Sequence, residues 1–247
     1  MIVIDKLTKS FGKLRVLDEV SLRCSQGECM ALIGPNGCGK TTLMKSILGM
    51  VVPDSGQITF DGVSITNQWL YRETIGYMPQ TGRYPDNMTI GQVIDMMRDI
   101  RKVAPADVDR VLFEAFEIDK LKNKRMRTLS GGTRQKVSAC LAFMFHNRVL
   151  ILDEPTAGLD PIATEILKDK IQAEKKKGKL IIITSHVLNE LDDLVTEVVY
   201  MQEGRVYFHR SMDWLKQETG EERLSKVISQ VIRKNNLGTY LKTTVHE

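Results

Sequence analysis

Apolar positions along the chain follow two patterns, and together these predict a protein of mixed α/β structure. Unbroken apolar runs at residues 29–33, 149–152 and 180–183 are typical of strands buried on both faces of a parallel sheet. Apolar residues at helical spacing predict helices at 43–48, 90–100, 105–116, 131–145 and 161–177. Further strands are predicted at 1–7, 16–23, 57–60 and 75–80, together with a hairpin of 198–201 and 205–209.

A glycine-rich loop lies between the first buried strand and the first helix. It consists of Gly34, Pro35, Asn36, Gly37, Cys38, Gly39, Lys40, Thr41 and Thr42, and it contains the pattern G-x-x-x-x-G-K-[ST]. Glycines let the backbone curl so that successive N–H groups face one anion at the positive end of a helix dipole. Lys40 adds a charge for the β- and γ-phosphates, and the Thr41 hydroxyl can ligate Mg²⁺. The loop therefore predicts a nucleotide site.

Two carboxylates end the buried run at 149–152, namely Asp153 and Glu154. Ligands of open α/β sheets bind at the carboxyl ends of the strands. We expect Asp153 to hold Mg²⁺, directly or through water, and Glu154 to polarise an attacking water. His186 follows the next buried run. It could contact the γ-phosphate or the same water, whereas a lone histidine is more often structural.

A second anion site is suggested where Ser130 stands as the N-cap of a helix. Gly131 and Gly132 in the first turn leave backbone N–H groups uncovered, although a simply capped helix start explains the same pattern. Asp160 caps the helix at 161–177 in the same way. Phe11, on a turn upstream of the phosphate loop, is either a hydrophobic plug or a ring that stacks on adenine.

Composition narrows the class of protein. The 247 residues are 42% hydrophobic and 27% charged with a net charge of +4, as in an ordinary soluble domain. No run approaches the roughly 18 apolar residues of a membrane span, and we expect no signal peptide. The four cysteines lack metal-type spacing and suit a reducing cytoplasm. The basic run at 122–127 lacks interleaved aromatic residues, which favours a solvated face over a nucleic-acid site.

Taken in order, the stretches GPNGCGKTT, Gln80, LSGGTRQ, VLILDEP, GLD and His186 resemble those of an ATP-binding-cassette (ABC) ATPase over roughly residues 1–210. The LSGG stretch separates this family from other phosphate-loop proteins. The resemblance implies a P-loop NTPase (RecA-like) core with an antiparallel β subdomain and an inserted helical subdomain. We expect an ATP-binding domain at 1–219, with its α/β core at 1–82 and 147–210 and its helical subdomain at 83–146, and a C-terminal extension at 220–247.

The resemblance also implies a role for each matching residue. Phe11 would stack on adenine, Lys40, Thr41 and Thr42 would contact phosphate and magnesium, and Gln80 would sense Mg²⁺ and the attacking water. Glu154 would be the catalytic base and His186 the switch histidine. Ser130, Gly131 and Gly132 would bind the γ-phosphate of ATP held by a second copy, and Asp160 would cross that interface. Thr133 and Cys38 depart from residues common in the family at those positions.

The favoured function is the ATP-hydrolysing subunit of an ABC transporter, with ATP and Mg²⁺ as ligands. We expect a second copy or a similar cassette as one partner, and as the other a separate membrane permease that docks near Gln80 and residues 81–89. The chain would then lie in the cytoplasm on the inner face of the membrane, with no nucleic-acid partner. An exporter-type system is favoured, and the accessory ATPases of nitrous-oxide-reductase maturation are one such group. The alternative is a soluble assembly system, such as iron–sulfur cluster assembly.

Overall fold

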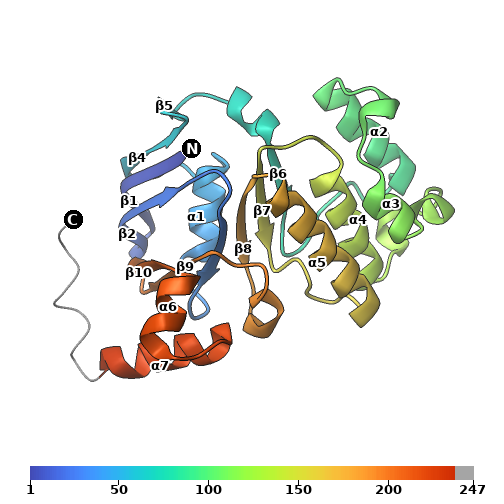
Figure 1. Cartoon of the computed structure of the whole chain (residues 1–247). Helices are drawn as coiled ribbons and strands as arrows, with labels where there is room; N and C mark the ends of the chain where they lie inside the picture. Colours follow the sequence, from blue (N-terminus) through green and yellow to red (C-terminus); the bar gives the residue numbers. More distant parts are fainter. Residues whose placement is uncertain (237–247) are drawn as a thin grey trace.

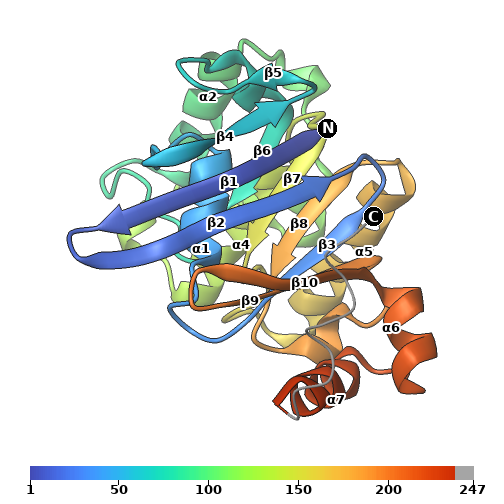
Figure 2. The same cartoon turned by 90° about the vertical axis from the view of Figure 1, so that its left-hand side faces the viewer.

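The computed structural model describes residues 1–236, so that residues 237–247 of the predicted extension lie outside the described residues. Two sheets and the helices around them make up the fold (Figure 1). Figure 2 shows the antiparallel sheet in front of the central one. The mixed α/β class predicted from the apolar patterns is confirmed.

The central sheet has six strands in the order β10-β9-β3-β8-β7-β6. Five of them are parallel, and β10 is antiparallel to β9. Their bounds are β3 Cys29–Ile33, β6 Ile75–Met78, β7 Val149–Asp153, β8 Leu180–Thr184, β9 Glu197–Gln202 and β10 Arg205–Ser211. The three unbroken apolar runs are wholly buried, because Leu180 and Ile182 face one core and Ile181 and Ile183 face the other. The predicted parallel strands are therefore confirmed.

The second sheet is antiparallel, in the order β2-β1-β4-β5. Its strands are β1 Ile2–Phe11, β2 Leu14–Cys24, β4 Ser55–Phe60 and β5 Val63–Ser64. Helix α1 (Lys40–Ile47) lies between the two sheets (Figure 1), and its Leu43 and Met44 are completely buried in the core there. This packing fixes the helix that follows the phosphate loop.

The first hairpin corrects the predicted strands at 1–7 and 16–23, which are too short. The strands pair as far as Phe11 and Leu14, and only Gly12 and Lys13 form the turn. The polar residues of this stretch find their hydrogen-bond partner outside the hairpin, just before β4. Asp54 accepts hydrogen bonds from the Ser10 N–H at 2.6 Å and from the Lys9 ammonium at 2.8 Å. Gly12, at φ +59°, supplies the backbone conformation of the turn.

Helices cover the other face of the central sheet. They are α2 Ile90–Arg101, α3 Val111–Ala115, α4 Gly131–Phe143, α5 Pro161–Lys176, α6 Met212–Thr219 and α7 Leu224–Asn236. Thr89 caps α2 through a reciprocal pair of hydrogen bonds with Gln92. Short 3₁₀ turns lie at Leu70–Thr74, Pro105–Asp107, Ile118–Leu121, Met126–Thr128 and Leu188–Leu191. Apolar residues of α4 to α7 share one core with the sheet.

The prediction of one helix over 105–116 is wrong. The chain makes a 3₁₀ turn at Pro105–Asp107 and starts again as α3 at Val111. Asp109 explains the break, because one oxygen accepts the Val111 N–H at 3.1 Å while the other accepts the Lys170 ammonium at 2.5 Å. The bounds of the helix predicted at 161–177 are close to those of α5, although Ile162 in its first turn is apolar and 76% exposed.

Candidate nucleotide site

A cleft with a volume of about 500 Å³ lies at the carboxyl ends of the parallel strands, over the start of α1. The structure brings residues from five separate stretches of the chain into it. These are Leu14 and Val16, then Asn36, Gly37, Gly39, Lys40, Thr41 and Thr42, then Gln80, then Asp153 and Glu154, and finally His186. Most of the site residues predicted from the sequence therefore share one cavity.

The phosphate loop needs glycine at two positions for reasons of space. A Cβ on Gly34 would lie 2.0 Å from the Met201 carbonyl oxygen, and one on Gly39 would lie 2.7 Å from that of Val16. Both glycines also have a positive φ, +151° and +106°. The Lys40 ammonium donates to the carbonyl oxygens of Gly34 at 2.7 Å and Pro35 at 3.1 Å. Within residues 1–236 it forms no ion pair with a carboxylate, so its charge is available to an anion.

Oxygen ligands suited to Mg²⁺ meet beside the loop. The Thr41 hydroxyl donates to Asp153 Oδ2 at 3.2 Å, and the Thr184 hydroxyl donates to Asp153 Oδ1 at 2.8 Å. Mg²⁺ prefers oxygen ligands and commonly binds through one or two carboxylates together with substrate phosphates. Among the described residues there is no group of three or more His, Cys, Asp or Glu side chains that could hold a metal ion. The donor set therefore fits the predicted metal.

Glu154 is held at both its side chain and its backbone. One carboxylate oxygen lies 3.1 Å from His186 Nε2, and the other accepts the His186 backbone N–H at 3.2 Å. The Glu154 N–H donates to the Thr184 carbonyl at 3.2 Å and to its hydroxyl at 3.0 Å. The residue has φ +52°, a region that non-glycine residues rarely occupy unless neighbouring contacts fix it. The geometry can hold a buried carboxylate in one orientation toward a water molecule in the cleft.

The glycine-rich start of α4 does not line the cleft of its own chain. Ser130 caps the helix by accepting the Thr133 N–H at 3.3 Å, and the side chains of the first turn are exposed or half-buried. Asp160 caps α5 and pairs with Lys136 at 2.6 Å. The hydrogen bond from Lys136, followed by the one from the Ala163 N–H, holds the pKa of Asp160 below its ordinary value.

Phe11 is half-exposed at the end of β1 and does not line the cleft, so its predicted contact with adenine stays a prediction. Leu14 and Val16, which sequence reasoning missed, form the apolar wall instead. The only signal in the sequence was the strand pattern that places them near the hairpin turn. Gln135 was also missed. It is buried in α4 and contacts the backbone after β7, although it belongs to the LSGGTRQ stretch.

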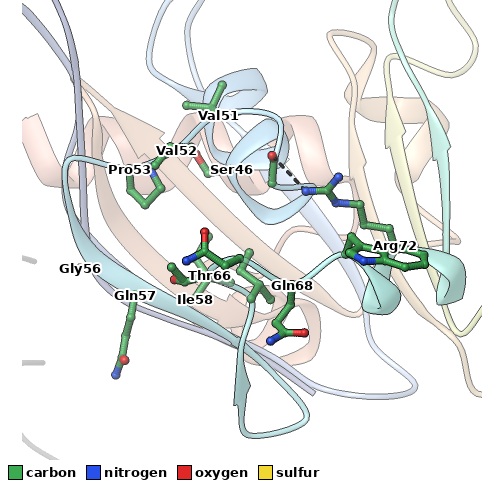
Figure 3. A pocket seen from close by; sticks show the side chains of 14 residues that line it. Ser46, Val51, Val52, Pro53, Gly56, Gln57, Ile58, Thr66, Gln68 and Arg72 are labelled. Atoms are coloured by element: carbon green, nitrogen blue, oxygen red, sulfur yellow. Dashed lines mark hydrogen bonds between the residues drawn. The ribbon is translucent and has the colours of Figure 1, made fainter.

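A second hollow of about 340 Å³ lies near the other end of α1 (Figure 3). Ser46 and Gly49 line it together with Ile58 of β4, and the Arg72 guanidinium donates to the Gly49 carbonyl at 3.3 Å. Lys40 begins α1 in the nucleotide cleft, whereas Ser46 lies near its last residue. The two hollows are therefore separate.

The fold and the cleft together define a P-loop NTPase with the arrangement of an ATP-binding cassette. The model of the family described as "ABC transporter" matches residues 17–157, more than half of the chain, so the chain belongs to the ABC transporter family as an ATP-binding cassette. Cassettes of this family bind ATP and ADP.

Three known proteins illustrate the likeness. "Nod factor export ATP-binding protein I" of Rhizobium meliloti is 33% identical over 203 residues, which are 81% of this chain and 61% of that protein. The chain thus spans about three fifths of this relative's length. A solved "ATP binding subunit of ABC transporter" is 26% identical with a TM-score of 0.86, over 94% of this chain and 99% of that one. A dimeric cassette solved in a post-hydrolysis state with ADP and Pi shares the fold at 20% identity and a TM-score of 0.75, over 86% and 99% of the two chains.

Proposed function

We propose that this cassette hydrolyses ATP for a transporter, and that two cassettes bind head-to-tail with two ATP molecules between them. One observation carries the proposal. The cleft contains the phosphate loop and both carboxylates, whereas the helix start at Ser130 lies outside it on the same chain. A site completed by a second copy would use both features. A solved relative with this fold is itself a dimer with ADP and Pi bound.

In this site Lys40 and the loop N–H groups bind the phosphates of the substrate, and Glu154 accepts a proton from the attacking water. His186 orients the Glu154 carboxylate through its contact at 3.1 Å. Thr41 and Asp153, with Gln80 nearby, would hold Mg²⁺, which neutralises charge on the phosphates.

Ser130 and the N–H groups of Gly131 and Gly132 stabilise the γ-phosphate of the partner's ATP, while Asp160 faces the partner chain. Once that phosphate is cleaved, the pair loosens.

Mixing two inactive variants tests whether one site is built from two chains. Lys40→Ala removes the phosphate contact in the cleft, and Ser130→Arg obstructs the helix start that would cover the partner's nucleotide. Each variant alone should lack ATPase activity. Their mixture should regain part of it, because a mixed pair contains one site with an intact cleft and an intact Ser130. Phosphate release from equimolar mixtures measures the gain.

The control for this experiment is a mixture of Lys40→Ala with a Lys40→Ala/Ser130→Arg double variant, which contains no complete site and should stay inactive. Ser130→Arg should still bind nucleotide in its own cleft with unchanged affinity, measured by a fluorescent ATP analogue. A mixture as inactive as its components would contradict a site shared between two chains.

The transport role rests on the family and on the printed name of the relative, which refers to export. No helix within residues 1–236 is long and apolar enough to cross a membrane. We assign the membrane passage to a separate permease, with the cassette on the inner face of the membrane. A hollow of about 290 Å³ beside edge strand β6 supports a docking place at residues 81–89, since Tyr77, Arg83 and Tyr84 line it.

Reversing the charge at Arg83 tests this docking place. Arg83 is exposed at the rim of the hollow, and Arg83→Glu should weaken recovery of the cassette with membranes that contain the permease. The purified variant should keep its ATPase activity. Arg23→Glu, on an exposed position of β2, is the matched control. Equal membrane recovery of both variants and the unchanged chain would place the permease elsewhere.

A further inference from the structure

The helix that starts at Ser130 also contacts the backbone of the proposed base in its own chain. Gln135 lies in the second turn of α4 and is 6% exposed. Its side-chain Nε2 lies 3.2 Å from the carbonyl oxygen of Glu154 and 3.2 Å from that of Pro155. One amide therefore bridges the two peptide carbonyls that follow the base.

These contacts hold the backbone of a residue whose own conformation is unfavourable. Glu154 has φ +52°, so its conformation depends on what surrounds it. The Thr184 carbonyl and hydroxyl hold the N–H of Glu154, and Gln135 holds its C=O. The residue is thus fixed on both sides of its Cα, by β8 on one side and by α4 on the other.

Further contacts join the start of α4 to the residues that follow β7. A Cβ on Gly132 would lie 2.9 Å from the carbonyl oxygen of Gly158, and the Lys136 ammonium lies 2.6 Å from an oxygen of Asp160. The first turns of α4 and residues 154–160 therefore pack as one unit. Gln135 is the member of this unit that reaches Glu154 itself.

We propose that Gln135 is a positioning residue for ATP hydrolysis, which sets the direction of the Glu154 carboxylate in its own chain. Its side chain does not line the nucleotide cleft. It acts by fixing the peptide of the base, so its loss should lower kcat and leave the KM for ATP unchanged. This inference rests on the proposed function, because it takes Glu154 as the base of that reaction.

Gln135→Met keeps the length of the side chain and removes the donor. We expect kcat to fall by roughly 10- to 100-fold, the scale expected when a reacting group is misplaced by about 1 Å. ATP-dependent pairing, followed by size-exclusion chromatography, should persist. Gln172→Met is the matched control, since it makes the same change on α5, away from the cleft. If Gln135→Met does not fold, as judged by its melting temperature, Gln135→Asn serves, because its shorter amide cannot bridge both carbonyls.

A mixed pair separates positioning within one chain from an effect of the helix on the partner's ATP. One tagged chain carries Glu154→Gln, so only the site containing the other chain's Glu154 turns over. Gln135→Met placed in the chain with the intact base should lower turnover. Placed in the chain that already lacks the base, it should add no further loss, although that chain's Ser130 end covers the active site.

Equal losses in the two placements, a loss only in the second, or no loss in either would each overturn the role of Gln135. The proposed function fails by a different result, in which the pair of an unchanged chain and a Glu154→Gln chain does not form with ATP or shows no turnover. The two failures are therefore distinguishable.

Discussion

We expect Glu154→Gln to slow ATP hydrolysis by about 10²- to 10⁴-fold, while ATP-dependent pairing of two chains should persist. The amide keeps the size of the side chain and can still contact His186, which lies 3.1 Å from the carboxylate in the structure. It cannot accept the proton of the attacking water, because it is not basic. ATP would then stay uncleaved in the site, and the pair would accumulate. Phosphate release and size-exclusion chromatography with ATP and Mg²⁺ measure the two effects.

The matched control is Glu190→Gln. Glu190 lies in the 3₁₀ turn after β8, accepts a hydrogen bond from the Thr156 hydroxyl, and does not line the cleft. It should change neither turnover nor pairing by more than a few-fold. Retained hydrolysis in Glu154→Gln would assign the base to another residue. A variant that hydrolyses no ATP and also stays monomeric at saturating ATP would contradict the proposed pairing instead.

The phosphate loop and the buried strands could be predicted because their signals are local. Residues 34–42 are contiguous, and the apolar run of β7 ends directly at Asp153. Parallel strands bring such carboxyl ends to one edge, so the strand assignments and the loop motif predicted that Lys40 and Asp153 lie close together. They left His186 open between this site and a structural role, and the structure places all three residues in one cleft. The resemblance to a family added the roles of these residues and the expectation of a second chain.

What could not be predicted depends on contacts between distant segments. Nothing near Asp109 indicates that it ends one turn and starts α3, because its partner Lys170 belongs to α5. The role of Gln135 also depends on a contact with a distant segment. Its buried amide is explained only once α4 packs against the residues that follow β7. In the hairpin, polar Lys9 and Ser10 suggested a loop, and the carboxylate of Asp54 that satisfies them lies far along the sequence.

A group of buried charges lies on α5, where it contacts Asp109 in the segment before α3. Glu174 and Lys170 are 2% and 4% exposed, and their side chains lie 2.9 Å apart. Glu174 also pairs with Lys177 at 2.7 Å and with Lys179, while Lys170 pairs with Asp109 at 2.5 Å. Burial alone would raise the pKa of Glu174, but hydrogen bonds from Lys177, Lys179 and Lys170 outweigh it and lower the pKa from 4.5 to about 2.

Glu174→Gln should therefore lower the free energy of unfolding by about 3 kcal/mol, the lower end of the range for breaking a buried ion pair, because Lys177 can turn to solvent. Since the pKa of Glu174 is lower in the folded protein than in the unfolded one, its contribution is complete above about pH 4.5 and is lost as the pH falls toward 2. Urea unfolding at pH 7 and at pH 3 measures both effects. The variant should lose less stability than the unchanged chain between these pH values.

Glu165→Gln provides the comparison, because Glu165 pairs with Lys168 on the exposed face of the same helix. A surface pair of this kind contributes about 0.5 kcal/mol or less, so its removal should hardly move the urea midpoint. The difference between the two variants isolates burial as the cause, since both remove one glutamate charge from α5. Equal midpoints for Glu174→Gln and Glu165→Gln would mean that solvent reaches the buried group and screens it as it does the surface pair.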